Sequence, residues 1–223
     1  MINIGKDQCE EIDLNIHSII NKLIHFFRKK RMARFIYVFK PNKQTQIIDV
    51  GGSAFNWDLI QAKSKITLLN LSKPKEMLPT HGKYDFVVGD GTALAFADNQ
   101  FDIAYSNSVI EHLHSWEKQK LFASEIRRVG RKVWVQTPAK IFFIEPHFIT
   151  PFIHYFPKKW QRHMLRNFTV WGWITRPTQE QIDSILHEIR LLTLNEMKEL
   201  FPGCAIEKEK FLFFTKCYIA IRK

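Results

Sequence analysis

The sequence contains few cysteines and no long uncharged apolar run. Its three cysteines, Cys9, Cys204 and Cys217, are widely separated and odd in number. They form neither a metal-ligand spacing nor a disulfide framework, so we expect no metal site and a reducing compartment. No stretch approaches the roughly 18 apolar residues that a membrane-spanning helix needs, and the acidic residues at positions 7–13 argue against a signal peptide. We therefore expect a soluble, unprocessed, cytoplasmic protein.

Phosphate-binding loops are also missing, because neither a P-loop nor a GxGxxG fingerprint occurs. Positive charge, in contrast, is plentiful: 33 Lys and Arg residues against 22 Asp and Glu give a net charge of +11. This excess favours an anionic partner such as nucleic acid, a membrane surface or a phosphorylated substrate. The 223 residues include 45% apolar residues and 19 Phe, enough for a packed core.

An apolar stripe with three- and four-residue spacing predicts a helix over about residues 7–39. A basic cluster, Arg28 to Arg31 with Arg34 one turn further on, lies near its end. Charge runs are usually solvated faces, so one interpretation is the solvated end of a helix packed on the domain. The other is a helix that binds a membrane surface or phosphate, which would place the protein at the inner membrane surface.

Short apolar runs alternate with segments compatible with helices in the middle of the chain. Helices are expected at 57–62 and 116–129. Continuous β-branched and aromatic runs are typical of a parallel sheet that is buried on both faces. They predict a Rossmann-like, doubly wound α/β sheet. The predicted strands are residues 46–50, 65–69, 84–88, 101–105 and 132–136.

The composition changes after Pro138. Residues 140–177 are rich in aromatics, prolines and basic residues, which indicates an inserted helical cap. Its basic residues can recognise phosphate or carboxylate on a substrate, or can simply be exposed. They are Lys158, Lys159, Arg162, Arg166 and Arg176.

The last part of the chain predicts two helices and an antiparallel strand pair. An amphipathic helix is expected at 178–189, and Thr193 with Glu196 fits a capping box that opens a second helix. The runs 205–211 and 217–222, connected around Thr215, predict a pair that closes the sheet. We expect one domain in four segments: an N-terminal helical segment (1–42), a cofactor-binding core (43–138), the cap (139–177) and the closing segment (178–223).

Polar residues follow the predicted strands, at the edge where open α/β sheets bind ligands. The first strand leads into Asp49-Val50-Gly51-Gly52-Ser53, whose glycines let the backbone turn sharply. Asn70 lies 21 positions beyond Asp49, where nucleoside-binding sheets place a ribose-binding and usually acidic side chain. Asp90, between Gly89 and Gly91, can accept a hydrogen bond from an adenine amino group. Together these residues predict a nucleoside site.

The ordered motifs IIDVGG, ITLLNL, YDFVVGDGTALAFADNQFDIAYSNSVIEHL and RVGRKVWVQTP resemble those of a class I S-adenosylmethionine-dependent methyltransferase of the small-molecule type 11 group. The resemblance covers residues 45–138. It implies a seven-stranded sheet with an antiparallel last strand, and S-adenosylmethionine as the cofactor.

The resemblance also implies the residues that hold this cofactor. Two departures matter: Phe55 stands where the glycine loop usually has a small residue, and Asn70 replaces the usual acidic ribose ligand. The lost charge predicts weaker binding or more reliance on backbone contacts, and leaves open a non-catalytic cofactor binder. The implied residues are Asp49, Gly51, Gly52 and Ser53 at the methionine end, Asn70 and Leu71 at the ribose, Asp90, Gly91 and Thr92 at the adenine, and Asn107 and Ser108 below the sulfonium.

Methyl transfer to oxygen or nitrogen usually needs a base near the ends of the fourth and fifth strands. His147 and His112 are the candidates, with Glu145 beside His147 and with His154 further along the cap; each histidine can instead be a satisfied packing residue. Glu111 is interpreted as a solvated or helix-starting acid. Flat rings suit an acceptor pocket and a sulfonium. The candidate acceptor-binding residues are Glu145, Tyr155, Trp171 and Trp173.

The leading functional prediction is methyl transfer to a small metabolite, a glycan precursor or a lipid-linked acceptor. The net charge suggests an RNA methyltransferase as an alternative. Against it, Ser106-Asn107-Ser108 replaces the Asn/Asp-Pro-Pro-Tyr/Phe motif of amino-methylating enzymes, and no cysteine nucleophile follows the fifth strand. A third alternative is a non-catalytic relative that docks on anionic membrane.

Overall fold

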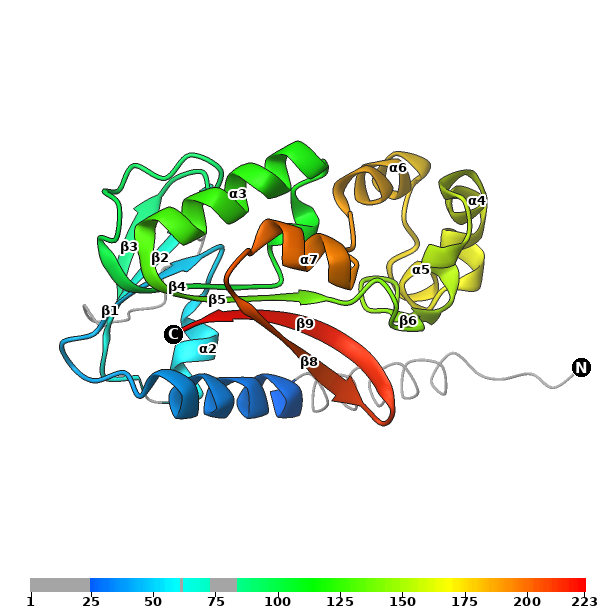
Figure 1. Ribbon diagram of the computed structural model, residues 1–223. Coiled ribbons are helices and arrows are strands. Elements are labelled where there is room, and N and C mark those ends of the chain that lie inside the picture. Colours follow the sequence, from blue (N-terminus) through cyan, green and yellow to red (C-terminus); the bar gives the residue numbers. More distant parts are fainter. Residues whose placement is uncertain (1–24, 61, 73–83) are drawn as a thin grey trace, which may run out of the picture. The chain divides into compact units, whose positions relative to one another are not determined.

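Figure 1 shows the computed structural model, which describes residues 25–60, 62–72 and 84–223. The chain divides into two compact units, one of residues 1–40 and 55–62 and the other of residues 41–54 and 63–223. Much of the helix predicted over residues 7–39, including most of its apolar stripe, lies outside the described residues. The helix is present over residues 25–39.

The first unit packs this helix around aromatic rings. Phe35 is fully buried, and its ring lies 5.2 Å from that of Phe39 and 5.6 Å from that of Trp57. Trp57 belongs to α2 (Ala54–Asp58), whereas the prediction placed a helix at 57–62. The helical turn therefore forms around Trp57 and does not start there. Burial of the indole beside Phe35 explains the difference, because it holds Trp57 inside the turn.

The basic cluster of this helix is not uniformly solvated. Arg31 is buried, and the Arg28 guanidinium lies 5.3 Å from the centre of the Phe55 ring. The Arg34 guanidinium stands 5.4 Å from the centre of the Tyr37 ring. These are distances at which cations and aromatic faces attract each other. At least part of the cluster therefore serves packing within its own unit.

The second unit contains a seven-stranded sheet in the order β3-β2-β1-β4-β5-β9-β8. The first five strands of this order are parallel, and β9 runs antiparallel to both of its neighbours, as predicted. β1 and β4 lie inside the sheet, and successive side chains on both of their faces are buried. Burial on both faces explains why their apolar runs are continuous. The strands are β1 (Gln46–Val50), β2 (Lys65–Asn70), β3 (Asp85–Val88), β4 (Phe101–Asn107), β5 (Gly130–Pro138), β8 (Ala205–Phe211) and β9 (Phe214–Arg222).

β2, β3 and β4 differ from the prediction by one or two residues at one end, whereas the bounds of β5 and β9 differ more, for reasons of pairing. β5 is longer than 132–136 because Gly130 pairs with Phe101 of β4 at one end and Pro138 with Cys217 of β9 at the other. β9 begins at Phe214, not 217, because it pairs directly with Phe211 across a two-residue turn. The antiparallel closing pair itself is confirmed.

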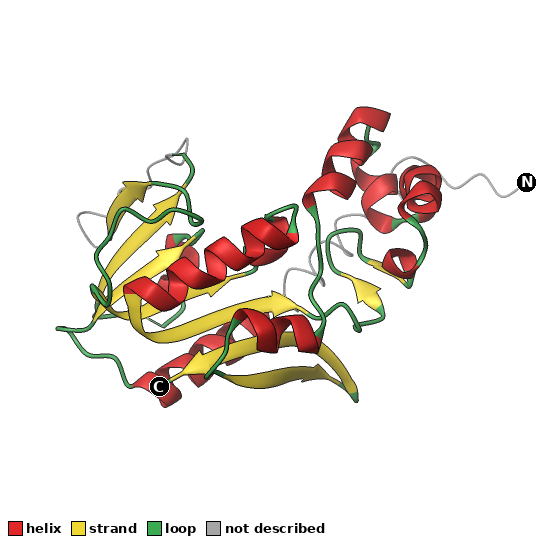
Figure 2. Cartoon of the chain, turned by 45° about the horizontal axis from the view of Figure 1, so that its top comes forward, coloured by secondary structure: helices red, strands yellow, loops and turns green. Residues whose placement is uncertain are grey.

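Helices α3 (Trp116–Val129) and α7 (Leu194–Leu200) cover one face of the sheet (Figures 1 and 2). α3 has the predicted bounds, and its Phe122 and Ile126 are buried in the main core together with Met197 of α7. The capping box predicted from Thr193 and Glu196 is present: each side chain bonds to the other's backbone amide.

The aromatic-rich segment forms a cap with a small core of its own. It comprises β6 (Ile144–Glu145), β7 (Thr150–Pro151), the short 3-10 helix η2 (Ile153–Tyr155), α4 (Lys158–Phe168) and α5 (Val170–Thr175). Helix α6 (Gln179–Glu188) joins it, with Ile182 and Leu186 in the same core as Phe148 and Leu165. Figure 2 shows these helices beside one end of the sheet. Among the described residues, no helix is long and apolar enough to cross a bilayer.

Candidate functional site

The strand order reverses at β1, which has β2 on one side and β4 on the other. Since β1 to β5 are parallel, their carboxyl ends lie at one edge of the sheet. An open α/β sheet binds ligands in the crevice at such a reversal. The structure places the predicted cofactor-binding residues at the ends of β1, β2, β3 and β4, as one group.

The loop after β1 requires both of its glycines. Gly51 has φ +76°, and a Cβ there would lie 2.4 Å from a methyl carbon of Val109. A Cβ on Gly52 would lie 1.9 Å from Cγ of Asp49, whose side chain is fully buried. Both distances are far below van der Waals contact, so the loop backbone lies directly on the Asp49 carboxylate. Ser53 follows, exposed, at the end of this loop.

Asn70, at the end of β2, holds the same loop. Its Nδ2 donates a hydrogen bond to the backbone carbonyl of Gly52 at 2.8 Å. A carboxylate could not donate this bond. The departure from the usual acidic residue therefore has a structural role, since Asn70 joins the end of β2 to the loop that follows β1. Leu71 next to it is exposed.

The turn after β3 holds Asp90 in one orientation. Its Oδ1 accepts hydrogen bonds from the backbone amide and from Oγ1 of Thr92, both at 2.8 Å. These two bonds are the main cause that lowers the pKa of Asp90, so the carboxylate is ionised at neutral pH. A Cβ on Gly91 would lie 2.8 Å from the Phe122 ring, which shows how closely the turn packs on α3.

The end of β4 is tied to the strands on both sides. Ser106 donates to the carbonyl of Val50 in β1 at 2.8 Å. Ser108, with φ +56°, donates to Oε1 of Gln136 in β5 at 3.0 Å. Asn107 lies between them. These bonds hold the segment predicted to lie below the sulfonium across the topological reversal.

The two predicted catalytic histidines meet directly. The segment after β4 continues into the 3-10 helix η1 (Ile110–His112), and Nε2 of His112 lies 3.3 Å from Nε2 of His147 in the cap. Each ring bonds a carboxylate through its other nitrogen. Nδ1 of His112 lies 2.8 Å from Glu188, and Nδ1 of His147 lies 2.7 Å from Glu145.

Both carboxylates orient the rings, and Glu145 also influences the ionisation of His147. Burial disfavours the charged form of His147, but the hydrogen bond and the negative charge of Glu145 outweigh burial, so the pKa of His147 is raised. Glu188 comes from α6, 76 residues beyond His112. Sequence reasoning missed Glu188, because no local pattern connects it with the histidine.

Glu111 is completely buried, which corrects its interpretation as a solvated acid, although it does lie in the first turn of η1 as a helix-starting acid would. Its Oε2 accepts a hydrogen bond from Oγ1 of Thr137 at 2.9 Å. Its Oε1 has no partner among the other residues that the structure describes. Burial raises the pKa of Glu111. In η1, a single turn directs Glu111 into the protein and His112 toward the cap.

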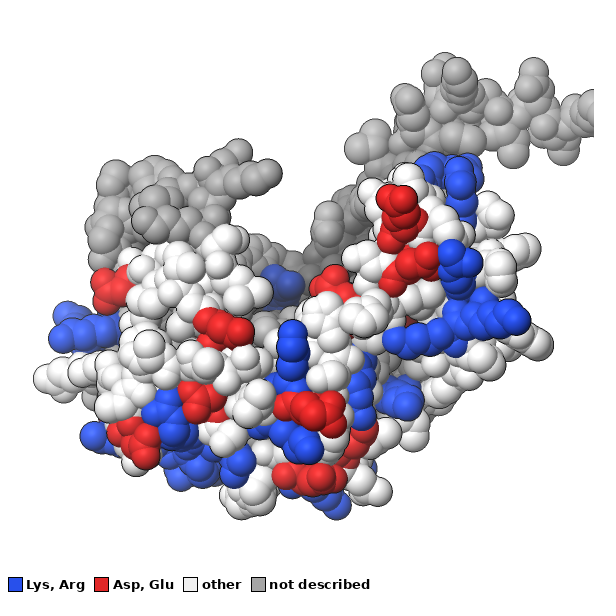
Figure 3. Space-filling model, turned by 90° about the horizontal axis from the view of Figure 1, so that it is seen from above, with Lys and Arg blue, Asp and Glu red and all other residues white. Residues whose placement is uncertain are grey.

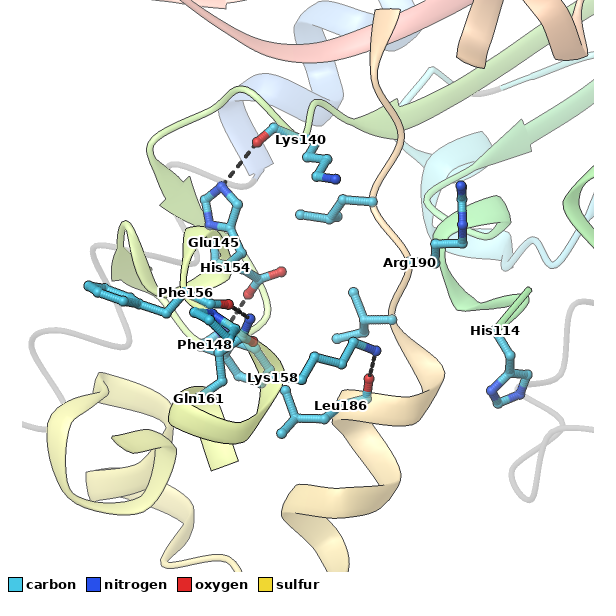
Figure 4. A pocket seen from close by; sticks show the side chains of 13 residues that line it. His114, Lys140, Glu145, Phe148, His154, Phe156, Lys158, Gln161, Leu186 and Arg190 are labelled. Atoms are coloured by element: carbon cyan, nitrogen blue, oxygen red, sulfur yellow. Dashed lines mark hydrogen bonds between the residues drawn. The ribbon is translucent and has the colours of Figure 1, made fainter. Parts of the chain in front are cut away.

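A cavity of about 510 Å³ lies between the cap and the segment that leads from α6 to α7 (Figure 4). Glu145, the partner of His147, lines it, so the cavity adjoins the histidine pair. Figure 4 shows Lys158 with its amine at the carbonyl of Leu186. The lining includes three basic side chains, Lys140, Lys158 and Arg190. Burial lowers the pKa of Lys158, and Arg190 is paired with the Glu196 carboxylate.

His154 contributes a neutral polar atom to this cavity. Its Nε2 lies 3.0 Å from the backbone carbonyl of Lys140, which requires a proton on this nitrogen. Burial lowers the pKa of His154, so the ring is neutral and Nδ1 keeps its lone pair. Nδ1 is buried and bonds to no described residue.

The predicted acceptor-binding aromatics do not gather around this cavity. Tyr155 is half exposed, and its hydroxyl donates to the carbonyl of Ile141 at 2.9 Å, beside a different and smaller cavity. Trp171 packs against Phe148 in the core of the cap. Trp173 is 55% exposed and donates to the carbonyl of Asn167. Of the four candidates, Glu145 alone lines the larger cavity.

The basic residues of the cap also divide into two groups. Figure 3 shows Lys and Arg side chains along the outer side of the cap helices, with acidic side chains beside them. Arg162 of α4 makes two hydrogen bonds to the Asp183 carboxylate. Lys158 instead lines the cavity.

The strand order, with an antiparallel β9, is that of the Rossmann-like methyltransferase fold. In agreement, residues 49–132 match the family model for a methyltransferase domain of type 11. This segment is therefore a methyltransferase domain, with S-adenosylmethionine as its cofactor. No curated protein matches the sequence.

Solved structures share the fold at low sequence identity. A Pyrococcus horikoshii protein is 15% identical, with TM-score 0.51, over 85% of each chain. A Burkholderia thailandensis 1,6-didemethyltoxoflavin N1-methyltransferase is 10% identical, with TM-score 0.54, over 99% of this chain and 90% of its own. A Haemonchus contortus phosphoethanolamine N-methyltransferase 2 is 15% identical, with TM-score 0.54, over 82% of this chain and 39% of its own.

Proposed function

We propose that the protein transfers the methyl group of S-adenosylmethionine to an oxygen or nitrogen atom of a small acceptor that carries phosphate or carboxylate. The acceptor is a metabolite, or the anionic end of a glycan or lipid-linked precursor. The observation that carries the acceptor class is the cavity next to the histidine pair, with Lys140, Lys158 and Arg190 in its lining. Cations in a partly enclosed site select anionic groups.

The chain connects the proposed donor site to this cavity over a short distance. Residues 107–112 run from the segment proposed to lie below the sulfonium to His112, which contacts His147. Methyl transfer depends mainly on aligning the acceptor atom with the bond from carbon to sulfur. The bonds of Ser106 and Ser108 hold the start of this segment in place.

We propose His147 as the base. The Glu145 carboxylate holds the proton on Nδ1, which leaves the lone pair on Nε2 to take a proton. The acceptor O–H or N–H gives its proton to Nε2, and its lone pair forms the new bond to the methyl carbon. The bond from that carbon to sulfur breaks, and sulfur leaves as the neutral thioether of S-adenosylhomocysteine.

Incubation of the purified protein with labelled S-adenosylmethionine and pooled fractions tests this function. We expect label in a fraction of anionic small molecules or lipid-linked sugars, and none in RNA. Transfer to RNA alone would instead support the alternative function, an RNA methyltransferase, which the net charge suggests. If calorimetry shows no donor binding, the remaining alternative is that the protein is a non-catalytic relative of the methyltransferases.

Asp90→Ala should weaken S-adenosylmethionine binding by about 1–3 kcal/mol, or roughly 5- to 150-fold in Kd, through loss of a hydrogen-bond acceptor proposed for the adenine. Calorimetric titration measures the change. Asp85→Ala, at the opposite end of β3, is the matched control and should bind normally. Unchanged affinity of a folded Asp90→Ala variant would place the adenine elsewhere.

Lys140→Met should raise the KM of the acceptor by roughly 10- to 100-fold, since a charge-assisted bond contributes about 1.5–3 kcal/mol. Methionine keeps most of the side-chain length but removes the charge. Lys159→Met, an exposed lysine of α4 that does not line the cavity, serves as the comparison. Equal KM values for the two variants would argue against an anionic acceptor in this cavity.

A further inference from the structure

The contact between His112 and His147 has an unusual electronic arrangement. Each ring presents Nδ1 to a carboxylate, Glu188 or Glu145, at 2.8 and 2.7 Å. A carboxylate accepts and does not donate, so the proton of each neutral ring lies on Nδ1. Both Nε2 atoms then carry lone pairs only 3.3 Å apart. Two such lone pairs need a shared proton or a cation between them.

The buried carboxylate of Glu111 lies close to the two rings. One ligand atom from each of Glu111, His112 and His147 can be chosen so that all three lie within 4.8 Å of one another. Glu111 is fully buried, and its Oε1 bonds to no other described residue. Leaving a buried carboxylate oxygen without a partner costs free energy unless something satisfies it.

We propose that Glu111, His112 and His147 bind one divalent transition-metal ion of the zinc type, although the cysteine spacing led us to expect no metal. Two nitrogen ligands about 2.0–2.1 Å from a tetrahedral zinc ion lie about 3.3–3.4 Å apart, close to the observed distance. Two imidazoles and one carboxylate suit zinc and its neighbours, whereas magnesium and calcium prefer oxygen ligands.

The outer contacts fit the same assignment. Histidines that bind metal commonly donate their other ring N–H to a carboxylate, which sets the tautomer and the direction of the ring. Here both histidines do so, through Glu145 of β6 and Glu188 of α6. Thr137 donates to the second oxygen of Glu111 and so orients that ligand as well.

The proposed ion has three protein ligands, which leaves a position open in a tetrahedral site. An ion bound by both Nε2 atoms would occupy the lone pair that the proposed base needs, so His147 serves either as base or as metal ligand, and the zinc titration distinguishes the two roles. In the second case the open position would hold the acceptor heteroatom, whose pKa the cation would lower. This inference shares its location with the proposed function, but metal binding needs neither donor nor acceptor.

Zinc titration by calorimetry into the full chain, stripped of metal and without a histidine tag, tests the proposal. We expect one ion per chain. His112→Ala and His147→Ala should each weaken binding at least 10-fold, and Glu188→Gln, which alters an outer contact of a half-exposed group, by about 10-fold or more. His187→Ala, an exposed histidine on the same helix as Glu188, should bind zinc normally.

Cobalt provides a second readout. Visible absorption of the cobalt-loaded chain should show bands of low-coordinate metal that disappear in His147→Ala, and excess magnesium should not displace the ion. Donor titration checks that each variant is folded. No zinc binding, or binding that neither histidine variant weakens, would overturn the site. Failed methyl transfer with intact zinc binding would count against the proposed function alone.

Discussion

His147→Ala is expected to lower methyl-transfer turnover by about 10²- to 10⁴-fold while the affinity for S-adenosylmethionine stays unchanged. This is the usual contribution of a positioned base. The imidazole is the group in the cap that meets the segment after β4, since its Nε2 lies 3.3 Å from that of His112. Rates with the labelled donor and the acceptor fraction, combined with donor calorimetry, separate the two quantities.

The control for this variant is His163→Ala, an exposed histidine of α4. It should keep full turnover. If His147→Ala is folded, binds the donor and retains normal turnover, His147 takes no part in removing the acceptor proton. A loss of turnover alone does not distinguish a base from a metal ligand, and the zinc titration makes that distinction.

Phe122→Ala is expected to lower the free energy of unfolding by about 3–5 kcal/mol, as is usual for truncating a buried aromatic side chain. Phe122 is fully buried in the main core between α3 and the sheet. Its ring also lies against Gly91, where an added Cβ would come within 2.8 Å of it. The cavity left by alanine should therefore also loosen the turn that holds Asp90.

Chemical denaturation measures this loss, and the adjacent Leu121 supplies the control. Leu121 is 54% exposed on the other side of α3, so Leu121→Ala should change stability by less than about 0.5 kcal/mol. A loss below about 1 kcal/mol for Phe122→Ala would mean that the core around Gly91 closes over the gap.

Most of the second unit could be predicted because its strands are short, continuous and buried. A short apolar run between two turns, such as residues 46–50, is compatible with few structures other than a buried strand. β1 has the predicted bounds at both ends. The bounds of β5 and β9 were less accurate, since the pairing of Gly130 with Phe101 and of Phe214 with Phe211 decides them. Such pairings are set by tertiary structure and leave no local pattern.

The candidate site was predictable where it follows the strands and less so where the cap contributes. His112 and His147 could be proposed as single residues, but their contact depends on how the cap packs. Trp171 and Trp173 were predicted to bind the acceptor because they are aromatic. In the structure Trp171 packs against the core of the cap, and Trp173 is half exposed. The roles of all these residues stay predictions until the variants are measured.

The bond from Asn70 to Gly52 has a consequence for ligand association. Because the amide side chain anchors the turn after β1 through a bond within the protein, donor binding need not order that backbone first. Preorganisation of this kind lowers the conformational entropy lost on binding. The smaller entropy loss compensates in part for the missing attraction of an acidic residue. The neutral Asn70 side chain is therefore compatible with a tight nucleoside complex.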